Sequence, residues 1–275
     1  MSEIVPAADG RNAFVVVNGE TEQSFVDLSD PLRLEFEYVQ RIAEVLDETV
    51  LARPRMENVR VVHVGGGGMT LPRYVQARRS GTAQIVFEPD TDLIERVRKE
   101  LPLPGRATTK IRPTDGRSGL AEMPSGCVDA VVIDAFAGAC VPAELATRLF
   151  FADGMRVLRD GGVLVMNVTD SAPFDWAKRC IAGVVANAAQ VAVIAEVPIL
   201  KGRRFGNLIV VAGSVLPLEA LADRLRLAAF PHRLLAGPPL RDWLGGALPF
   251  DGADALPSPE PNWSKTWFSS PQRRR

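Results

Sequence analysis

Three acidic residues, Glu88, Asp115 and Asp134, each stand at or just after the end of a β-prone run. Ligands of open α/β sheets bind beyond the carboxyl ends of the strands, so these positions favour ligand contact. Glu88 could accept hydrogen bonds from ribose hydroxyls, or it could be a solvated carboxylate at a strand end. Asp115, in "PTDGR", could hold the exocyclic amine or ring of an adenine, or it could form an Asx-type turn. Asp134 ends the apolar run "AVVID", where a carboxylate is costly unless it is paired, hydrated or used, which favours ligand contact or catalysis.

Four consecutive glycines, Gly65, Gly66, Gly67 and Gly68, separate an apolar run from a helix start. Bare backbone at a strand-to-helix turn lets main-chain N–H groups approach a ligand at the positive end of the helix, and that ligand is usually a nucleotide or nucleoside. Glu88 follows roughly 20 residues later, the usual distance of a ribose-binding acid in such folds. The sequence therefore predicts a nucleoside site formed by the glycine loop and Glu88.

An alternation of strands and helices positions these residues. The predicted strands are 60–64, 84–88, 108–111, 130–133 and 163–168. The predicted helices between and after them are 71–79, 92–101, 142–158 and 175–188. Asp92 and Glu95 form a capping-box-like pair for the second of these helices. This alternation of strands and helices is typical of a parallel sheet with crossover helices.

The segment that follows this alternation distinguishes two kinds of doubly wound fold, that of class I S-adenosylmethionine-dependent transferases and that of dinucleotide dehydrogenases. The runs 190–200 and 207–213 are both strand-like, and only "KGRRFG" separates them. A loop of this length is too short for a helical crossover, so the two strands should pair antiparallel. We therefore predict an α/β fold with the Rossmann-like sheet of class I S-adenosylmethionine-dependent methyltransferases, mostly parallel with an antiparallel last hairpin.

The chain divides into three predicted parts. Residues 1–30 contain a small β-hairpin, "FVVVNGETEQSFV", with a tight turn at Asn18-Gly19. Residues 31–235 form the Rossmann-like nucleoside-binding transferase domain, which begins with an amphipathic helix whose cap is expected at Asp30-Pro31. Residues 236–275 form a Pro-rich tail that we expect to be extended, with aromatic residues that could dock on the body or on a second subunit.

Composition excludes several classes of function. The 275 residues, 47% of them hydrophobic, suffice for one sizeable core and an appendage. A net charge of -1 gives no reason to expect nucleic acid. No signal pattern occurs and no apolar run approaches the ~20 residues that span a bilayer, so we expect a cytoplasmic protein without a membrane partner. Cys127, Cys140 and Cys180 match neither a zinc pattern nor a disulfide framework, and no metal is expected.

From Arg60 to about Ala212 the sequence resembles the spermidine synthase (polyamine aminopropyltransferase) family, and is most like the divergent spermidine-synthase-like proteins of actinobacteria. The motifs that carry this resemblance, in order along the chain, are "VGGGGMTLPRYV", "IVFEPDTDLIERVRKELPLP", "PTDGR", "VDAVVIDAFAGACVPAELATRLFF" and "GRRFGNLIVVA". The resemblance implies that Glu88 binds the ribose of a sulfonium nucleoside, that Asp115 and Gly116 lie against its adenine, and that Asp134 is the catalytic acidic residue. It also implies a small amine as the second substrate and allows a homodimer.

The chain departs from the family at two acidic positions. Gly68 stands where aminopropyltransferases carry the Asp of Gly-Gly-Gly-Asp-Gly, and Ala137-Gly138 replaces a second Asp followed by Pro. These carboxylates would ordinarily face cationic amines, and each charge-assisted hydrogen bond is worth roughly 1.5–3 kcal/mol. Three functions therefore stay open: aminopropyl transfer from decarboxylated S-adenosylmethionine to an amine, methyl transfer from S-adenosylmethionine, and a nonenzymatic nucleoside-binding or scaffold role.

Both transfer reactions are the same in kind. A nucleophile attacks a carbon next to a sulfonium, a neutral thioether leaves, and Asp134 could take or relay the proton of an amine. His63 lies inside a buried-looking strand and is expected to be a core residue. Glu35 and Glu37 are expected on a solvated helix face rather than toward the nucleophile, and Trp176 is expected to cover the core rather than stack on adenine.

Overall fold

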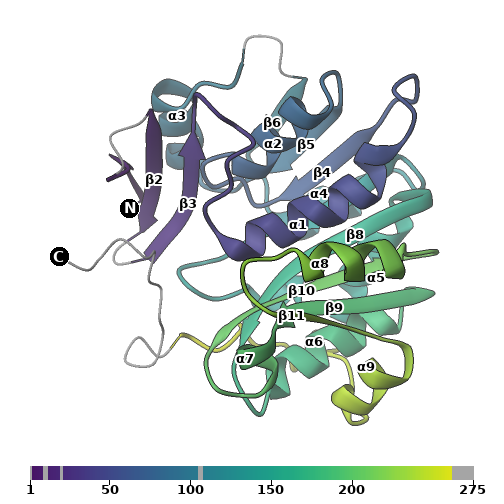
Figure 1. Ribbon diagram of the computed structural model, residues 1–275. Coiled ribbons are helices and arrows are strands. Elements are labelled where there is room, and N and C mark those ends of the chain that lie inside the picture. The colour runs from purple at the N-terminus through teal and green to yellow at the C-terminus, as the bar shows by residue number, and fades with distance from the viewer. Residues whose placement is uncertain (1, 9–11, 19–20, 105–107, 262–275) are drawn as a thin grey trace.

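The computed structural model describes residues 2–8, 12–18, 21–104 and 108–261. Within these residues, eight strands form a central sheet in the order β11-β9-β10-β8-β7-β4-β5-β6 (Figure 1). Five of them run parallel: β6 (Thr109–Arg112), β5 (Ala83–Phe87), β4 (Arg60–Val64), β7 (Val128–Ile133) and β8 (Leu158–Asp170). The predicted mostly parallel sheet is confirmed.

The antiparallel part of the sheet follows β8. Strand β10 (Gly206–Gly213) lies between β8 and β9 (Gln190–Glu196) and is antiparallel to both. The predicted antiparallel hairpin is therefore confirmed, but residues 197–200, which were predicted as strand, form the short helix α7 (Val197–Leu200) at its turn. Strand β11 (His232–Ala236) pairs antiparallel with β9 and was not predicted, because this edge strand is short and only partly buried.

A second, antiparallel sheet stands at the N-terminal end of the chain. Among the described residues it comprises β1 (Ser2–Pro6), β2 (Ala13–Asn18) and β3 (Thr21–Asp27), in that order. The pairing of β2 with β3 confirms the predicted hairpin, whereas Gly19 of its predicted turn lies outside the described residues. Val16 and Val26 of this sheet pack with Met69 and Val86, so the sheet rests on the chain next to the glycine loop.

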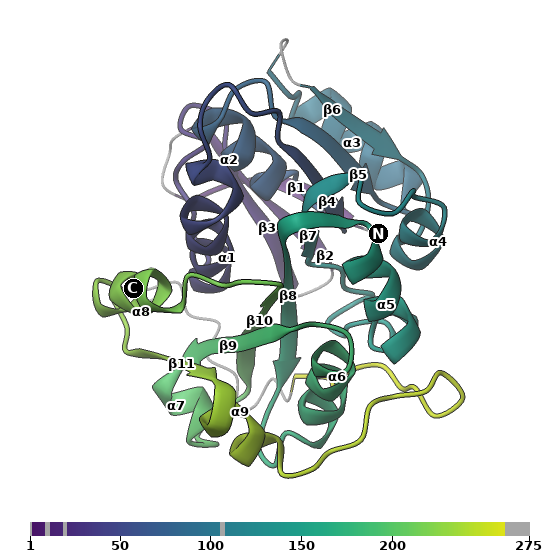
Figure 2. The same ribbon diagram turned by 90° about the vertical axis from the view of Figure 1, so that its right-hand side faces the viewer.

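Helices cover both faces of the central sheet (Figure 2). One face carries α1 (Glu37–Glu48), α2 (Thr70–Arg78) and α8 (Leu218–Arg226), whose apolar side chains share one core with alternate residues of β4, β7, β8 and β10. The other face carries α4 (Gly116–Ala121), α5 (Arg148–Arg156), α6 (Asp175–Val185) and α9 (Gly237–Leu244) around a second core. Helix α3 (Thr91–Glu100) packs with the N-terminal sheet. Successive side chains of a strand point to opposite faces of the sheet, so the central sheet has one core on each face.

Two helix starts differ from the prediction. The first helix begins at Glu37 and not near Asp30, because Asp30 makes a local turn in which its carboxylate accepts from the Leu32 N–H at 3.1 Å. Helix α3 is capped by Asp90, whose Oδ1 accepts from the Leu93 N–H at 2.9 Å, and Asp92 lies in the first turn instead. In both cases an Asp carboxylate accepts a nearby backbone N–H, as a capping residue does. Asp30 does so in a turn that no helix follows, and the cap of α3 lies two residues before the predicted one.

The helix predicted over 142–158 is two elements. A short 3-10 helix (η2, Ala143–Leu145) precedes α5, and Thr147 caps α5 by accepting from the Phe150 N–H at 3.2 Å. Strand β8 then begins at Leu158, earlier than predicted. Helix α4 was missed, because six residues are too few to show a 3.6-residue period.

The segment predicted as an extended tail begins with a helix. Helix α9 has prolines in its first turn, where a missing N–H costs nothing, and it buries Leu240 and Leu244. Residues 245–261 contain no helix or strand and lead back toward the site. The three-part division of the chain stays a prediction. Across the described ranges, none of the helices has the length and apolar character required to cross a bilayer.

Candidate functional site

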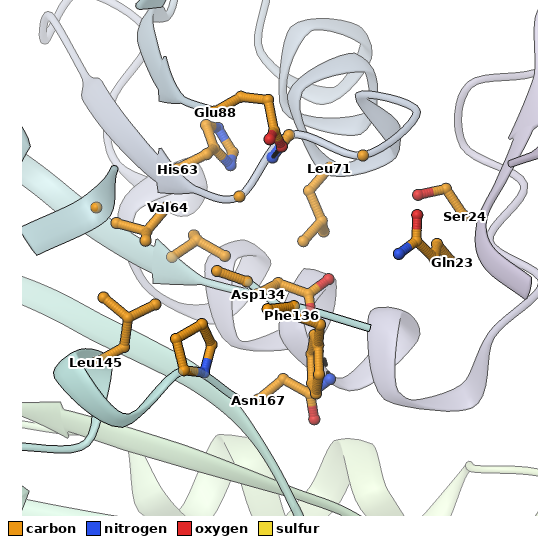
Figure 3. Close-up of a pocket in the computed structure, with 18 of the residues that line it drawn as sticks. Gln23, Ser24, His63, Val64, Leu71, Glu88, Asp134, Phe136, Leu145 and Asn167 are labelled. Carbon is orange, nitrogen blue, oxygen red and sulfur yellow. Dashed lines mark hydrogen bonds between the residues drawn. The ribbon is translucent and has the colours of Figure 1, made fainter. Parts of the chain in front are cut away.

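A cavity of ≈ 470 Å³ opens at the carboxyl ends of the parallel strands (Figure 3). Nearly all of the predicted site residues line it: Gly65, Gly66, Gly67, Glu88, Asp115, Gly116 and Asp134. Gly68, which was also predicted to bind the nucleoside, does not line it. Figure 3 shows Asp134 near the middle, Glu88 on one side, and Gln23 and Ser24 of β3 facing the cavity from another.

Asp134 follows directly on β7, whose six residues are all buried. Its backbone N–H donates to Val64 O at 2.9 Å, which fixes the chain at the point where it leaves the sheet. Asn167 Nδ2 donates to Asp134 Oδ1 at 3.0 Å, and the Tyr38 hydroxyl donates to Oδ2 at 3.5 Å. Burial raises the pKa of Asp134 to about 6, although these two hydrogen bonds act to lower it. A carboxylate with this pKa can accept a proton near neutral pH.

Tyr38 remains a hydrogen-bond donor in this arrangement. Burial, and then the charge of Asp134, raise the pKa of its phenol well above the ordinary value. The hydroxyl is therefore protonated across the physiological range and can stabilise the ionised form of Asp134. Tyr38 comes from α1, so this helix positions one of the two partners of the carboxylate.

Asn167 comes from the buried middle of β8 and is 2% exposed. Because its Nδ2 donates to Asp134, its Oδ1 is available as an acceptor, and this atom has no hydrogen-bond partner among the described residues. A buried acceptor without a partner is costly, and Asn167 lines the cavity. The geometry favours a donor on a bound ligand at this position.

Glu88 ties the end of β5 to the glycine loop. Its Oε2 accepts from the Gly66 N–H at 2.9 Å and its Oε1 from the Asp90 N–H at 3.0 Å. A carboxylate has about four lone-pair sites, so two remain for hydroxyl donors. Glu88 is 9% exposed and lines the cavity. This geometry is compatible with the predicted contact to ribose.

Asp115 has a structural role at the cavity edge. Its Oδ1 accepts from the Ser118 N–H at 2.8 Å and caps α4, and this hydrogen bond is the main reason that the pKa of Asp115 is lowered. The turn-forming alternative for its side chain is thus realised, and contact with adenine stays a prediction. A Cβ on the neighbouring Gly116 would lie 2.1 Å from Val64 Cγ1, so packing against β4 demands glycine here.

The glycine loop is packed against protein on several sides. A Cβ on Gly65, which has a φ of +92°, would lie 2.3 Å from Asp134 O. A Cβ on Gly66 would lie 2.7 Å from Met69 Cε, and one on Gly68 would lie 2.7 Å from Val26 Cγ2. The Gly68 N–H donates to Ser24 Oγ at 3.0 Å, so this residue faces the N-terminal sheet. Close packing as well as ligand access therefore explains the glycines.

The charged side chains that line the cavity are of one sign. Its carboxylates are Glu22, Glu88, Asp90, Asp115, Asp134 and Glu144, and no Lys or Arg of the described residues lines it. His63 also lines it, yet burial lowers the pKa of this histidine to about 4, so the ring is neutral at pH 7. The cavity therefore favours a cationic ligand over an anionic one.

His63 and Trp176 lie where the sequence placed them. His63 is 1% exposed, and its Nε2 lies 2.9 Å from Gln84 Oε1. Trp176 is buried, and its Nε1–H donates to Leu256 O at 2.7 Å, outside the cavity lining. Among the described residues no group of three or more His, Cys, Asp or Glu is arranged to hold a metal ion.

Sequence reasoning missed both partners of Asp134. It weighed Glu35 and Glu37, of which only Glu37 lies on α1, and passed over Tyr38 of the same helix. Glu37 does not line the cavity, and its Oε1 lies 3.7 Å from both Arg41 Nη2 and His232 Nε2. Asn167 could have been found, because an amide inside the apolar run "VLVMNVTD" is costly unless it has a role.

Comparisons with known proteins support the resemblance drawn from the sequence. No family model matches the chain. It is 26% identical over 171 residues to the polyamine aminopropyltransferase of Chromobacterium violaceum, an alignment that covers 61% of this chain and 62% of that protein. The chain thus spans less than two thirds of that relative. The motif-based resemblance to spermidine synthases is confirmed at this level.

Solved structures extend the likeness to most of the chain. A probable spermidine synthase from Corynebacterium glutamicum has a TM-score of 0.84 and 28% identity, over 93% of this chain and 94% of that one. Human methyltransferase-like protein 13 in complex with SAH has a TM-score of 0.54 and 17% identity, over 80% and 96% of the two chains. The second likeness shows the fold alone, and it confirms the class I methyltransferase fold.

Proposed function

We propose that this protein is a transferase that moves an aminopropyl group from decarboxylated S-adenosylmethionine to a small amine. The observation that carries the proposal is the cavity lining, which includes six acidic residues and, within the described chain, no Lys or Arg. Both the sulfonium donor and an amine acceptor are cations, and such a lining favours them. The likeness to the Corynebacterium protein, over 93% of this chain, supports the same reaction class.

Sheet order divides the cavity into two halves with Asp134 between them. Gly65, Glu88 and Asp115 follow β4, β5 and β6 on one side of β7, and they suit a nucleoside. Asn167 of β8 and Asn207 of β10 lie on the other side of β7. We assign the first half to the nucleoside and the second to the amine. Ligands of doubly wound sheets bind in such a crevice beyond the strand ends.

The residues around Asp134 suit the chemical step. The amine nitrogen forms a bond to the propyl carbon next to the sulfonium, the C–S bond breaks, and its electron pair goes to sulfur to give methylthioadenosine. The amine must lose a proton, and Asp134 is the acceptor because its pKa is raised to about 6. Asn167 Oδ1 can accept a second N–H of the amine, which would direct the nitrogen lone pair toward the carbon.

Methyl transfer from intact S-adenosylmethionine is the alternative reaction, since the family's loop acid is absent. Intact S-adenosylmethionine carries a carboxylate, for which the described lining offers no cationic side chain. Gly68 faces Ser24 and Val26, so its lack of an acid removes no charge from the cavity wall. The remaining carboxylates still disfavour a bound carboxylate, and aminopropyl transfer is the better-supported reaction.

Calorimetry with decarboxylated S-adenosylmethionine, intact S-adenosylmethionine and methylthioadenosine tests the proposal. We expect the decarboxylated form to bind at least about 10-fold more tightly than the intact form, the effect of roughly 1.4 kcal/mol from one favourable charge contact. Tighter binding of the intact form would favour methyl transfer. Binding of none of the three would favour the nonenzymatic scaffold role. A homodimer and a cytoplasmic location stay predictions from the sequence.

A further inference from the structure

Residues 249–261, here called the C-terminal strap, run from the region of α9 around α6 (Figure 2). At the end of the strap, Pro261 lines the cavity. Phe250 pairs with Thr147 in a parallel bridge, and its carbonyl accepts from the Arg148 N–H at 2.9 Å. The guanidinium carbon of Arg179 lies 4.1 Å from the centre of the Phe250 ring. These contacts fix the first part of the strap on α5 and α6.

The second part of the strap is also fixed, by two side chains of α6. Trp176 Nε1 donates to Leu256 O at 2.7 Å, and Arg179 forms an ion pair with Asp254. Ser258 is 3% exposed although the strap has no regular structure. A buried serine in such a segment indicates a specific contact, because its hydroxyl must be satisfied.

Ser258 makes a two-way clamp on the loop that follows Asp134. Its N–H donates to Val141 O at 3.0 Å, and its Oγ accepts from the Val141 N–H at 2.8 Å. The same Oγ lies 3.5 Å from Thr169 Oγ1 of β8. The clamp thus joins the strap, the loop and β8, and each of these three segments carries cavity-lining residues.

The strap also contributes to the cavity wall itself. Pro261 is buried and lines the cavity together with Thr169, Asn167 and Asn207. Thr169 and Asn207 are register partners in the pairing of β8 with β10. This wall lies on the β8–β10 side of β7, opposite the strands that carry the glycine loop and Glu88.

We infer that the C-terminal strap determines how the acceptor amine binds: Ser258 positions the loop 135–142, and Pro261 closes the β8–β10 end of the cavity. This inference rests on the proposed function, because it assigns that end to the acceptor. Ser258 is a positioning residue, since it touches the loop and not the reacting atoms. The hydrogen-bonding contacts of Ser258 are to Val141 and Thr169, and neither residue belongs to the nucleoside half.

The test uses full-length variants and binding measurements that do not require turnover. The protein is first saturated with methylthioadenosine, and 1,4-diaminobutane is then titrated by calorimetry. We expect Ser258→Ala to weaken amine binding by roughly 3- to 10-fold, the effect of one neutral hydrogen bond, with methylthioadenosine affinity changed less than about 2-fold. Pro261→Ala should weaken amine binding in the same way, and it serves if Ser258→Ala folds poorly.

Leu256→Ala is the matched control on the same strap, because Leu256 is 64% exposed and the contact of its carbonyl with Trp176 is retained. It should change neither affinity. Unchanged amine affinity in both Ser258→Ala and Pro261→Ala would overturn the inference, as would an equal loss of methylthioadenosine affinity. If the wild-type protein binds both ligands but transfers nothing, the proposed function is wrong, and the affinities of the two variants still decide the strap's role in amine binding. If it binds neither ligand, both are wrong.

Discussion

Asn167 Nδ2 donates a hydrogen bond to Asp134 Oδ1 at 3.0 Å and leaves its own Oδ1 without a partner in the part of the chain that the structure describes. The pair joins β8 to the end of β7 and places one ionisable and one neutral acceptor side by side in the cavity. Neither group alone defines an amine site. Together they can accept two N–H groups of one nitrogen, which a primary amine offers and a hydroxyl does not.

Replacement of Asn167 should alter the pH dependence of transfer. Its hydrogen bond lowers the pKa of Asp134 against the larger effect of burial. In Asn167→Leu the pKa of Asp134 should therefore rise above about 6, and the acidic limb of the kcat/KM profile should move to higher pH. A pH–rate series on both proteins checks this. An acidic limb at the same pH in a folded variant would mean that Asn167 does not act on Asp134.

Asp134→Asn should slow transfer by about 100-fold or more, the usual contribution of a positioned acid–base group. The asparagine Oδ1 can still accept from Asn167, so nucleoside affinity should be retained. Single-turnover kinetics with calorimetry as the control separates these effects. A variant that transfers at the wild-type rate would show that another residue takes the proton.

The same substitution should raise stability above pH 6. The pKa of Asp134 in the folded protein, about 6, is higher than the ordinary value of 3.8 that it has in an unfolded chain. Folding therefore favours the protonated form, and this contribution is lost as pH rises through about 6. We expect the Tm of Asp134→Asn to exceed that of the wild type at pH 7.5, with the difference diminishing toward pH 4. A constant difference across that range would contradict the raised pKa.

The strands, and the acidic residues at their ends, could be predicted from the sequence because they depend on local residue patterns. Arg60–Val64 was predicted with correct bounds, since a buried parallel strand needs a short β-branched run. The start of α1 was not, because Asp30-Pro31 carries a genuine turn signal that no helix follows. Local residue types indicate that the chain turns, and only packing decides which turn opens a helix.

The residues around Asp134 could not be predicted from the sequence, because they come from segments that lie far apart along the chain. Tyr38 lies 96 residues from Asp134 along the chain, Asn167 lies 33 residues away, and Ser258 lies 117 residues from Val141. No local pattern links such positions. For the same reason the sequence suggested that Gly68 faces an amine, whereas the N-terminal sheet occupies that side of the loop.

Gly68→Asp tests which way position 68 faces. A Cβ at Gly68 would lie 2.7 Å from Val26 Cγ2 and 3.1 Å from Ser24 Cβ, so the new side chain must displace β3. We expect a loss of roughly 1–3 kcal/mol in the free energy of unfolding, as for overpacked sites. Gly68→Ala is the matched control without charge and should lose a similar amount. A large gain in affinity for decarboxylated S-adenosylmethionine in Gly68→Asp alone would show that the position reaches the ligand.

Glu88→Ala should weaken nucleoside binding by roughly 1.5–3 kcal/mol, because a charged acceptor for ribose hydroxyls is lost. Glu88 also holds the Gly66 and Asp90 N–H groups, so Glu88→Gln, which keeps one acceptor oxygen, should have a smaller effect. Calorimetry with methylthioadenosine measures both affinities. Equal affinity in the wild type and in a folded Glu88→Ala would remove Glu88 from the site.

The central claim is that a cavity lined by carboxylates transfers an aminopropyl group to an amine, and the mass of the product tests it most directly. The protein is incubated with 1,4-diaminobutane and either decarboxylated or intact S-adenosylmethionine, with Asp134→Asn as the control. The account predicts an aminopropylated amine and methylthioadenosine from the decarboxylated donor, at a rate that falls about 100-fold or more in the control. A methylated amine from the intact donor, with no aminopropylated product from the other, would contradict it.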